Sequence, residues 1–166
     1  GPDLTAAGQI LERGIVQLGG TAQGHVLLRY GTVLLLQGRY HEAIITLQDA
    51  RDALKSEGDL NRAGSASQSL GFCYANIGLL QQAESCFYEA KELLGNDEQW
   101  RPELALAVAA ERRGRYDEAL QILATVERRF TSAESRMYAR SVRANLTASL
   151  HDWPQTATLE QEAMER

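Results

Sequence analysis

The residue types that most often carry chemistry in proteins are few and scattered in this sequence. Its three histidines, His25, His41 and His151, lie far apart, and none has a second ligand or a triad partner at a fixed spacing. A lone histidine of this kind more often packs between helices or lies at the surface than binds a metal. The histidines therefore predict no metal centre and no pair of nucleophile and base.

The two cysteines, Cys73 and Cys86, form no CxxC motif and no paired Cys/His spacing of the kind that binds zinc. A disulfide between them is conceivable. A reduced, buried thiol is the favoured interpretation, because free cysteine behaves as a small apolar residue in protein interiors.

The acidic residues that stand out fall in predicted loops or helix caps and form no general acid/base pair in a recognisable cleft. They are Glu57, Asp59, Asp97 and Glu98. No GxGxxG or GxxxxGK[ST] motif occurs, so the sequence predicts no phosphate-binding loop. We interpret a further set of glycines as scattered loop and turn residues, namely Gly14, Gly19, Gly20 and Gly24. We therefore expect a protein that is not an enzyme and that binds no cofactor or metal.

Charge and hydropathy exclude some partners. The chain has 166 residues and a net charge of −5, with acids and bases mixed and no basic block, so we expect no nucleic acid bound by this segment. The longest apolar run, from Val33 to Leu36, is far too short to span a membrane. With no signal peptide, we expect a cytoplasmic protein. Gly1 and Pro2 resemble a cleaved tag, and we expect a fragment of a longer protein.

The composition favours helices, because Leu, Ala, Glu, Gln and Arg dominate and only three prolines occur. The predicted fold is all-α, a single solenoid domain over residues 1–166 with about nine helices. We expect one helix at 3–17, which is the second helix of a truncated repeat. Helix hairpins should follow at 22–57, 60–95, 100–130 and 132–165.

The hairpin around residues 70–90 shows how such helices can pack. Small residues, Gly71, Ala83 and Ala90, alternate with the large Tyr74 and Phe87. This alternation lets two antiparallel helices approach closely and interlock.

Several residues are expected at helix ends. Gly58 can adopt the left-handed conformation that closes a helix, and Asp59 can cap the next one. Residues 131–134 fit a capping box. Asp152 can cap the last helix, with Pro154 in its first turn.

The predicted turns repeat along the chain. Three segments superimpose without gaps: Gly38-Arg-Tyr-His-Glu-Ala43, Gly78-Leu-Leu-Gln-Gln-Ala83 and Gly114-Arg-Tyr-Asp-Glu-Ala119. A weaker copy begins at His151. The offsets from 38 to 78, from 78 to 114 and from 114 to 151 are 40, 36 and 37 residues. A period in this range is typical of solenoids of helix pairs. The first offset exceeds the usual ~34, and we expect the extra residues to lengthen helices around residues 56–62.

Here the sequence resembles the tetratricopeptide repeat family. The resemblance rests on two full copies, Tyr30-Gly31 with Gly38, Tyr40, Ala43 and Ala50, and Leu70-Gly71-Tyr74 with Gly78, Ala83, Phe87 and Ala90. The third copy has Ala107 where the family prefers glycine. The fourth has Arg143 where a buried leucine is expected, and its register can slip by one. The alternative is a non-repeating helical bundle.

The resemblance implies a right-handed superhelix whose concave face is lined by the first helix of each pair and binds extended or helical peptides. By alignment, the groove residues are Leu28, Thr32, Leu35, Gln68, Phe72, Asn76, Arg101, Leu104, Val108, Arg112, Tyr138 and Asn145. Gln and Asn side chains there can hydrogen-bond a peptide backbone. Alternatively, the apolar members pack against the next repeat and the polar ones form a solvated face. Co-chaperone members of the family hold a C-terminal carboxylate with lysine, asparagine and arginine at set groove positions. Of the residues at those positions here only Arg101 fits, so we do not expect capture of chaperone tails.

The leading functional prediction is a non-catalytic scaffold that binds a peptide or helix of a protein partner in this groove. The alternative is an effector-sensing or regulatory segment of a larger bacterial transcription regulator or signalling ATPase. No membrane contact is expected. The exposed ends of a solenoid also make a homo-oligomer conceivable.

Overall fold

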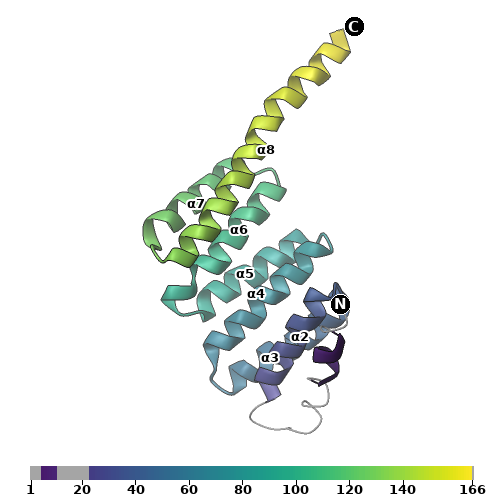
Figure 1. Ribbon diagram of the computed structural model, residues 1–166, viewed down its shortest axis with the longest axis vertical. Coiled ribbons are helices and arrows are strands. Elements are labelled where there is room, and N and C mark those ends of the chain that lie inside the picture. The colour runs from purple at the N-terminus through teal and green to yellow at the C-terminus, as the bar shows by residue number, and fades with distance from the viewer. Residues whose placement is uncertain (1–4, 11–22, 166) are drawn as a thin grey trace. The chain divides into compact units, whose positions relative to one another are not determined.

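The computed structural model describes residues 5–10 and 23–165, with the side chains of 5–10 and 23–151. By its internal contacts the chain divides into two compact units, Gly1–Pro102 and Glu103–Arg166, and each is described by itself. The described residues form helices and turns only (Figure 1), which confirms the predicted all-α class. One continuous domain across the two units stays a prediction.

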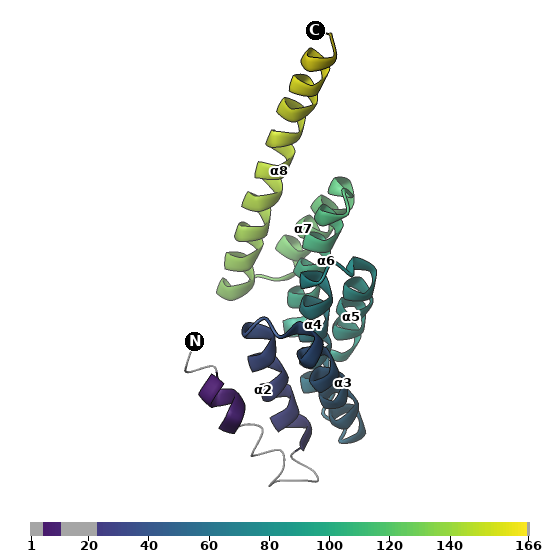
Figure 2. The same cartoon turned by 90° about the vertical axis from the view of Figure 1, so that its right-hand side faces the viewer.

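The first unit contains four helices that lie where the sequence predicts the hairpins 22–57 and 60–95. They are α2 (Gln23–Leu36), α3 (Tyr40–Ser56), α4 (Leu60–Asn76) and α5 (Leu80–Leu93), followed by the short 3-10 helix η2 (Asn96–Glu98). Helix α2 packs on α3, α4 on α5, and α3 on α4, while α2 also touches α4 (Figure 2). The extra length of the first repeat lies in α3 and α4, which have 17 residues each against 14 in α2 and α5.

Four of the chain reversals share one backbone motif. At the first, the Gly38 N–H donates to the Leu35 carbonyl at 3.0 Å and the Arg39 N–H donates to the Leu34 carbonyl at 2.9 Å. This pair of bonds defines a Schellman motif, which needs a left-handed residue at the glycine position. The same two bonds recur at the other three reversals, and the glycines have φ of 77°, 78°, 83° and 78° at Gly38, Gly58, Gly78 and Gly114.

Asp59 caps α4, as the sequence predicts. Its carboxylate accepts the Arg62 backbone N–H at 3.2 Å and pairs with the Arg62 guanidinium at 2.7 Å. The hydrogen bond from the Arg62 side chain is the main cause of the lowered pKa of Asp59. The cap therefore depends on a charged carboxylate.

Glycine also allows the helices of each hairpin to approach closely. A Cβ built on Gly71 would lie 2.3 Å from the Phe87 ring, and one on Gly31 would lie 2.6 Å from the Leu47 side chain. Gly24 was wrongly interpreted as a loop residue, because it is buried in α2 and a Cβ there would lie 2.8 Å from Leu54. The loop interpretation of Gly14, Gly19 and Gly20 lies outside the described residues.

A small core joins the two hairpins of the first unit. Leu34, Ala43, Leu47, Leu70 and Cys73 form a buried cluster. Ala43 is fully buried and packs beside leucines from the neighbouring helices. Small and large residues therefore interlock, as the sequence predicts.

Both cysteines carry free thiols. Cys73 is buried, and Cys86 is half-buried and packs against the same core cluster. Burial raises the pKa of each thiol to about 11. Both thiols are therefore protonated near neutral pH, as in inert core cysteines.

A short helical segment, residues 5–10, lies against α2. Gly8 is buried there, and a Cβ on it would be in van der Waals contact with Tyr30, Val33 and Gln37. This is part of the helix predicted at 3–17, of which residues 11–17 lie outside the described residues.

The helices α6 (Trp100–Arg112), α7 (Tyr116–Arg129) and α8 (Ala133–Glu165) follow, with α6 beginning just before the boundary of the second unit. The Arg129 guanidinium pairs at 3.1 Å with the buried Glu103 carboxylate and joins α7 to α6. Helix α8 packs on α7, where Arg143 pairs with Glu127. Arg143 is therefore an exposed ion-pair partner at the position where the repeat expects a buried leucine.

The hairpin predicted at 132–165 is wrong, because α8 runs without a break from Ala133 to Glu165. The predicted turn has His151 where the other copies have glycine, and a histidine does not readily adopt the left-handed conformation of that turn. The helix count of about nine included two helices in this stretch. The predicted capping box at 131–134 is replaced by an N-cap one residue later, since Ser132 Oγ accepts the Ser135 backbone N–H at 3.1 Å.

Candidate partner-binding surface

Three of the predicted groove residues lie on α2 and three on α4, and the two helices touch. Leu28 and Leu35 are half-buried and pack against the core cluster. Thr32 is half-buried, and its hydroxyl donates to the Leu28 carbonyl at 2.8 Å. The two leucines thus contribute to packing, as the alternative interpretation holds, and each leaves part of its side chain accessible.

Phe72 is the most prominent apolar side chain on α4. It is 41% exposed, although Leu70, Gly71 and Cys73 around it are buried. Its ring meets the edge of the Phe87 ring, with centroids 5.4 Å apart and an interplanar angle of 65°. This edge contact fixes the ring orientation while one side of the ring stays open.

Two amide side chains flank Phe72, one helical turn away on either side. Asn76 is engaged: its Nδ2 donates to the Phe72 carbonyl at 2.8 Å, and its Oδ1 accepts from the Tyr40 hydroxyl at 3.3 Å. Gln68 differs, because its Oε1 is buried and has no hydrogen-bond partner among the described residues. A buried acceptor without a donor is unusual and is available to a ligand donor that reaches it.

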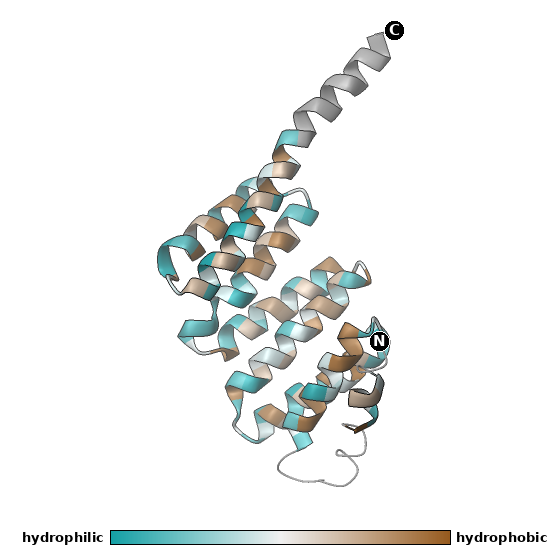
Figure 3. Ribbon diagram, viewed as in Figure 1, coloured by the Kyte–Doolittle hydropathy of each residue, from teal (hydrophilic) through white to brown (hydrophobic). Residues whose placement is uncertain are grey.

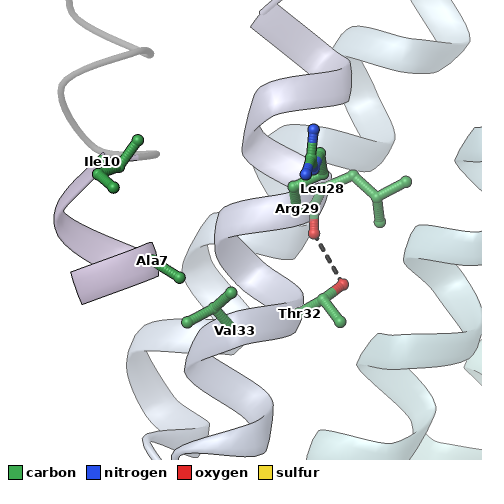
Figure 4. A pocket seen from close by; sticks show the side chains of 6 residues that line it. All are labelled: Ala7, Ile10, Leu28, Arg29, Thr32 and Val33. Carbon is green, nitrogen blue, oxygen red and sulfur yellow. Dashed lines mark hydrogen bonds between the residues drawn. The ribbon is translucent and has the colours of Figure 1, made fainter. Parts of the chain in front are cut away.

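A pocket of about 440 Å³ lies between segment 5–10 and α2 (Figure 4). Its walls are Ala7, Ile10, Leu28, Arg29, Thr32 and Val33. In Figure 4, Val33 points toward Ala7, whereas Leu28 points away from segment 5–10. Two predicted groove residues, Leu28 and Thr32, therefore line this pocket, and Arg29 is the one charged residue among the described residues of its wall.

The remaining groove candidates behave differently from one another. Leu104 is only 5% exposed, so it is a core residue and was wrongly placed in the groove. Val108, Arg112, Tyr138 and Asn145 are exposed on the second unit. Whether these four join the α2 and α4 residues in one groove stays a prediction.

Arg101 is held by its own neighbours in the first unit. Its guanidinium pairs with Glu98 and lies 4.5 Å from the centroid of the Trp100 ring. The arginine that alone fits the carboxylate-binding pattern is thus already engaged.

Alignment to the repeat missed Arg29, Ala7 and Ile10 as site residues. Arg29 is the only Asp, Glu, Lys or Arg residue of α2, and this isolation in a highly apolar helix could have identified it (Figure 3). Ala7 and Ile10 were missed because the prediction took groove residues only from the first helix of each pair, and segment 5–10 belongs to the predicted second helix of a truncated repeat.

The described residues contain neither a metal-binding cluster nor a membrane-spanning helix. Within residues 5–10 and 23–151, no group of three or more His, Cys, Asp or Glu side chains could hold a metal ion. None of the helices described is long and apolar enough to cross a bilayer.

No family profile and no curated protein matches the sequence. Solved structures do resemble the fold. A protein from Podosopora anserina described as a kinesin light chain with nearly identical TPR-like repeats matches with a TM-score of 0.69 and 14% identity, over 98% of this chain and 86% of that chain. A variant of that protein matches with a TM-score of 0.70 and 15% identity, over 98% and 85%. The chain therefore has the all-α, tetratricopeptide-like repeat fold that its sequence predicts.

Proposed function

We propose that this chain is a non-catalytic protein-interaction scaffold, cytoplasmic in location, that binds a peptide or helix of a partner on the face shared by α2 and α4. The observation that carries the proposal is Phe72. A large aromatic ring on the outer face of α4 is held in orientation by Phe87 yet remains 41% exposed. Oriented aromatic side chains of this kind are typical anchors of peptide-binding surfaces.

Other exposed apolar residues offer a weaker surface. Ile45 on α3 is 64% exposed and Tyr88 on α5 is 51% exposed. Both are single apolar residues on helices rich in carboxylates, and isolated exposed apolar residues are normal on protein surfaces. The α2–α4 face differs because Phe72 and the buried Gln68 oxygen without a described partner both lie on α4, and the neighbouring α2 borders the pocket.

The test begins with peptides selected from a random twelve-residue display library on the full chain. Their affinity is then measured by fluorescence anisotropy for the wild type and for Phe72→Ser, which we expect to bind at least about tenfold more weakly. Tyr88→Ser is the matched control, an aromatic residue on α5 that is 51% exposed, and should leave affinity unchanged.

Because Phe72 touches Phe87, its loss can also lower stability. Leu36→Ser is the second variant. Leu36 lies at the end of α2 and is 65% exposed, so it contributes little to the core. Circular dichroism shows whether each variant is folded. Peptides whose binding survives both substitutions in folded protein would refute the proposal.

The regulatory alternative has one observation in its favour. The pocket between segment 5–10 and α2, about 440 Å³, falls within the volume range of small-molecule sites. We propose as a second candidate that an effector binds there. A metabolite that raises the melting temperature of the wild type but not of Val33→Trp, which fills the pocket, would support it.

A further inference from the structure

Another pocket of the first unit opens where the end of α4 meets the start of α5. Its volume is about 490 Å³, and the described residues that line it are Tyr74, Gln81, Gln82, Ser85 and Cys86. None of these five side chains is charged near neutral pH, since burial raises the pKa of the Cys86 thiol to about 11. The volume falls in the range of small-molecule sites, so the pocket is large enough for a small ligand.

The polar side chains of this pocket are available to a ligand. Among the described residues, none donates to or accepts from the Gln81 and Gln82 amides or the Ser85 hydroxyl. Tyr74 is held in place, because its hydroxyl accepts from the Gln48 amide at 3.2 Å and its side chain packs against the core cluster. The pocket therefore presents donors and acceptors without counter-charges beside an oriented aromatic ring.

The equivalent positions in two other copies of the repeat are charged. They form ion pairs, Arg39 with Glu42 at the start of α3 and Arg115 with Glu118 at the start of α7. The aligned residues of the second copy are Leu79 and Gln82, which cannot form such a pair. In agreement, the first turns of α3 and α7 contain acidic residues, whereas the first turn of α5 contains none.

Helix stability does not explain this loss of charge. A carboxylate in the first turn stabilises a helix through the helix dipole, and an ion pair three residues apart adds to that effect. The second copy has neither, and it has instead a pocket lined by neutral side chains. A charged pair at the edge of that pocket would hold its own hydration water and oppose the entry of an uncharged ligand.

We infer that this pocket binds an uncharged saccharide. Its hydroxyl groups would hydrogen-bond the amides of Gln81 and Gln82 and the hydroxyl of Ser85, and an apolar face of the sugar ring would pack on Tyr74. A sugar fits because each of its hydroxyls both donates and accepts, as the amides of the wall do together. The inference goes beyond the proposed function, because the pocket contains none of the predicted groove residues.

The test is the titration of the ¹⁵N-labelled full chain with a defined set of sugars, with affinities measured by calorimetry. The neutral probes are glucose, N-acetylglucosamine, maltose and cellobiose, and the charged probes are glucuronate and glucosamine. At least one neutral sugar should bind with a Kd of about 1 mM or below. Its amide shift changes should centre on Tyr74 and Gln82. The charged probes should bind at least about tenfold more weakly, because the wall offers them no counter-charge.

A double variant tests the neutral lining directly. Leu79→Arg/Gln82→Glu gives the second copy the ion pair of the other copies, and it should weaken the sugar at least about tenfold without lowering the melting temperature. The matched control is Arg115→Leu/Glu118→Gln, which removes the same pair from the third copy and should leave sugar affinity unchanged. Ser85→Trp fills the pocket from an exposed position and should also abolish binding.

Several results would overturn the inference. These are the absence of binding by every neutral sugar, equal affinity for the charged probes, shift changes that leave Tyr74 and Gln82 unaffected, and undiminished affinity in folded Leu79→Arg/Gln82→Glu. None of these results bears on the proposed function, which Phe72→Ser and Leu36→Ser test with different ligands.

Discussion

The two hairpins of the first unit and the long helix of the second were expected to follow the same repeat, and they do not. In the first unit, chain reversals occur at Gly38, Gly58 and Gly78, each with a left-handed glycine followed at once by the next helix. At the aligned fourth position, His151 continues α8 as a helix. The residues that favour a helix start after it, Asp152 and Pro154, are present and do not produce a turn.

This difference shows which part of the repeat signature makes the hairpin. A cap residue lowers the free energy of a helix start, but the preceding helix must first end. Only the glycine supplies the left-handed conformation that pairs the last carbonyls of the preceding helix in the Schellman motif. A left-handed glycine therefore makes the reversals at Gly38, Gly58, Gly78 and Gly114, whereas α5 and α7 end at Leu94 and Phe130 in extended conformation.

The largest effect should come from closing the gap between the helices of a hairpin. Gly71→Ala places a methyl group 2.3 Å from the Phe87 ring, and we expect a loss of about 2–3 kcal/mol in the free energy of unfolding, measured with urea. The double variant Gly71→Ala/Phe87→Leu, which has the residues of the third copy, Ala107 and Leu123, should recover most of it. No destabilisation by the single change would contradict the close packing.

Removing a left-handed glycine should have the next largest effect. Gly78 has φ of 83° and nothing within 4 Å of a built Cβ, so Gly78→Ala strains the backbone without any clash. We expect a loss of about 1–2 kcal/mol in thermal or urea unfolding. A stability equal to that of the wild type would show that the turn tolerates an ordinary residue.

The reverse change tests the same comparison in α8. His151→Gly supplies the missing left-handed residue directly before Asp152, and we expect the helix to break there at a cost of about 1 kcal/mol. Amide hydrogen exchange should become faster around residue 151 than in the wild type. Unchanged protection would mean that glycine alone does not create the turn.

Asp59 gives a smaller, pH-dependent effect. Because its pKa is lowered in the folded state, its stabilising contribution is present above the unfolded-state pKa and is lost as pH falls through the folded pKa. Asp59→Ala should lose about 1 kcal/mol at pH 7. The difference in urea midpoint between wild type and Asp59→Asn should shrink below about pH 4. A difference that is constant with pH would argue against the charged cap.

The sequence predicted much of the fold because the repeat is carried by local signals. Gly58 and Asp59 determine a turn and a cap whatever packs around them. The fourth copy failed because alignment gave the same weight to Asp152 as to the missing glycine. Gly24 was missed because its role depends on Leu54, which lies 30 residues away and is brought to it only by folding.

The site was less predictable than the fold. Alignment placed Phe72 and Thr32 on an accessible face, but it placed Leu104 there too, although the side chain is buried. The exposure of a given side chain depends on which residues the neighbouring helices place next to it. The repeat pattern describes an average copy and does not contain that information. Alignment did not identify Arg29, because what distinguishes it is that it is the one charged residue of α2. That is a property of the whole helix and not of a motif position.

The most direct test is to map a selected peptide onto the ¹⁵N-labelled full chain by NMR. If partners bind the face shared by α2 and α4, the amide chemical shifts of Arg29, Thr32 and Phe72 and their neighbours will change. Shift changes centred on Ile45 and Tyr88, with α2 and α4 unaffected, would contradict the account.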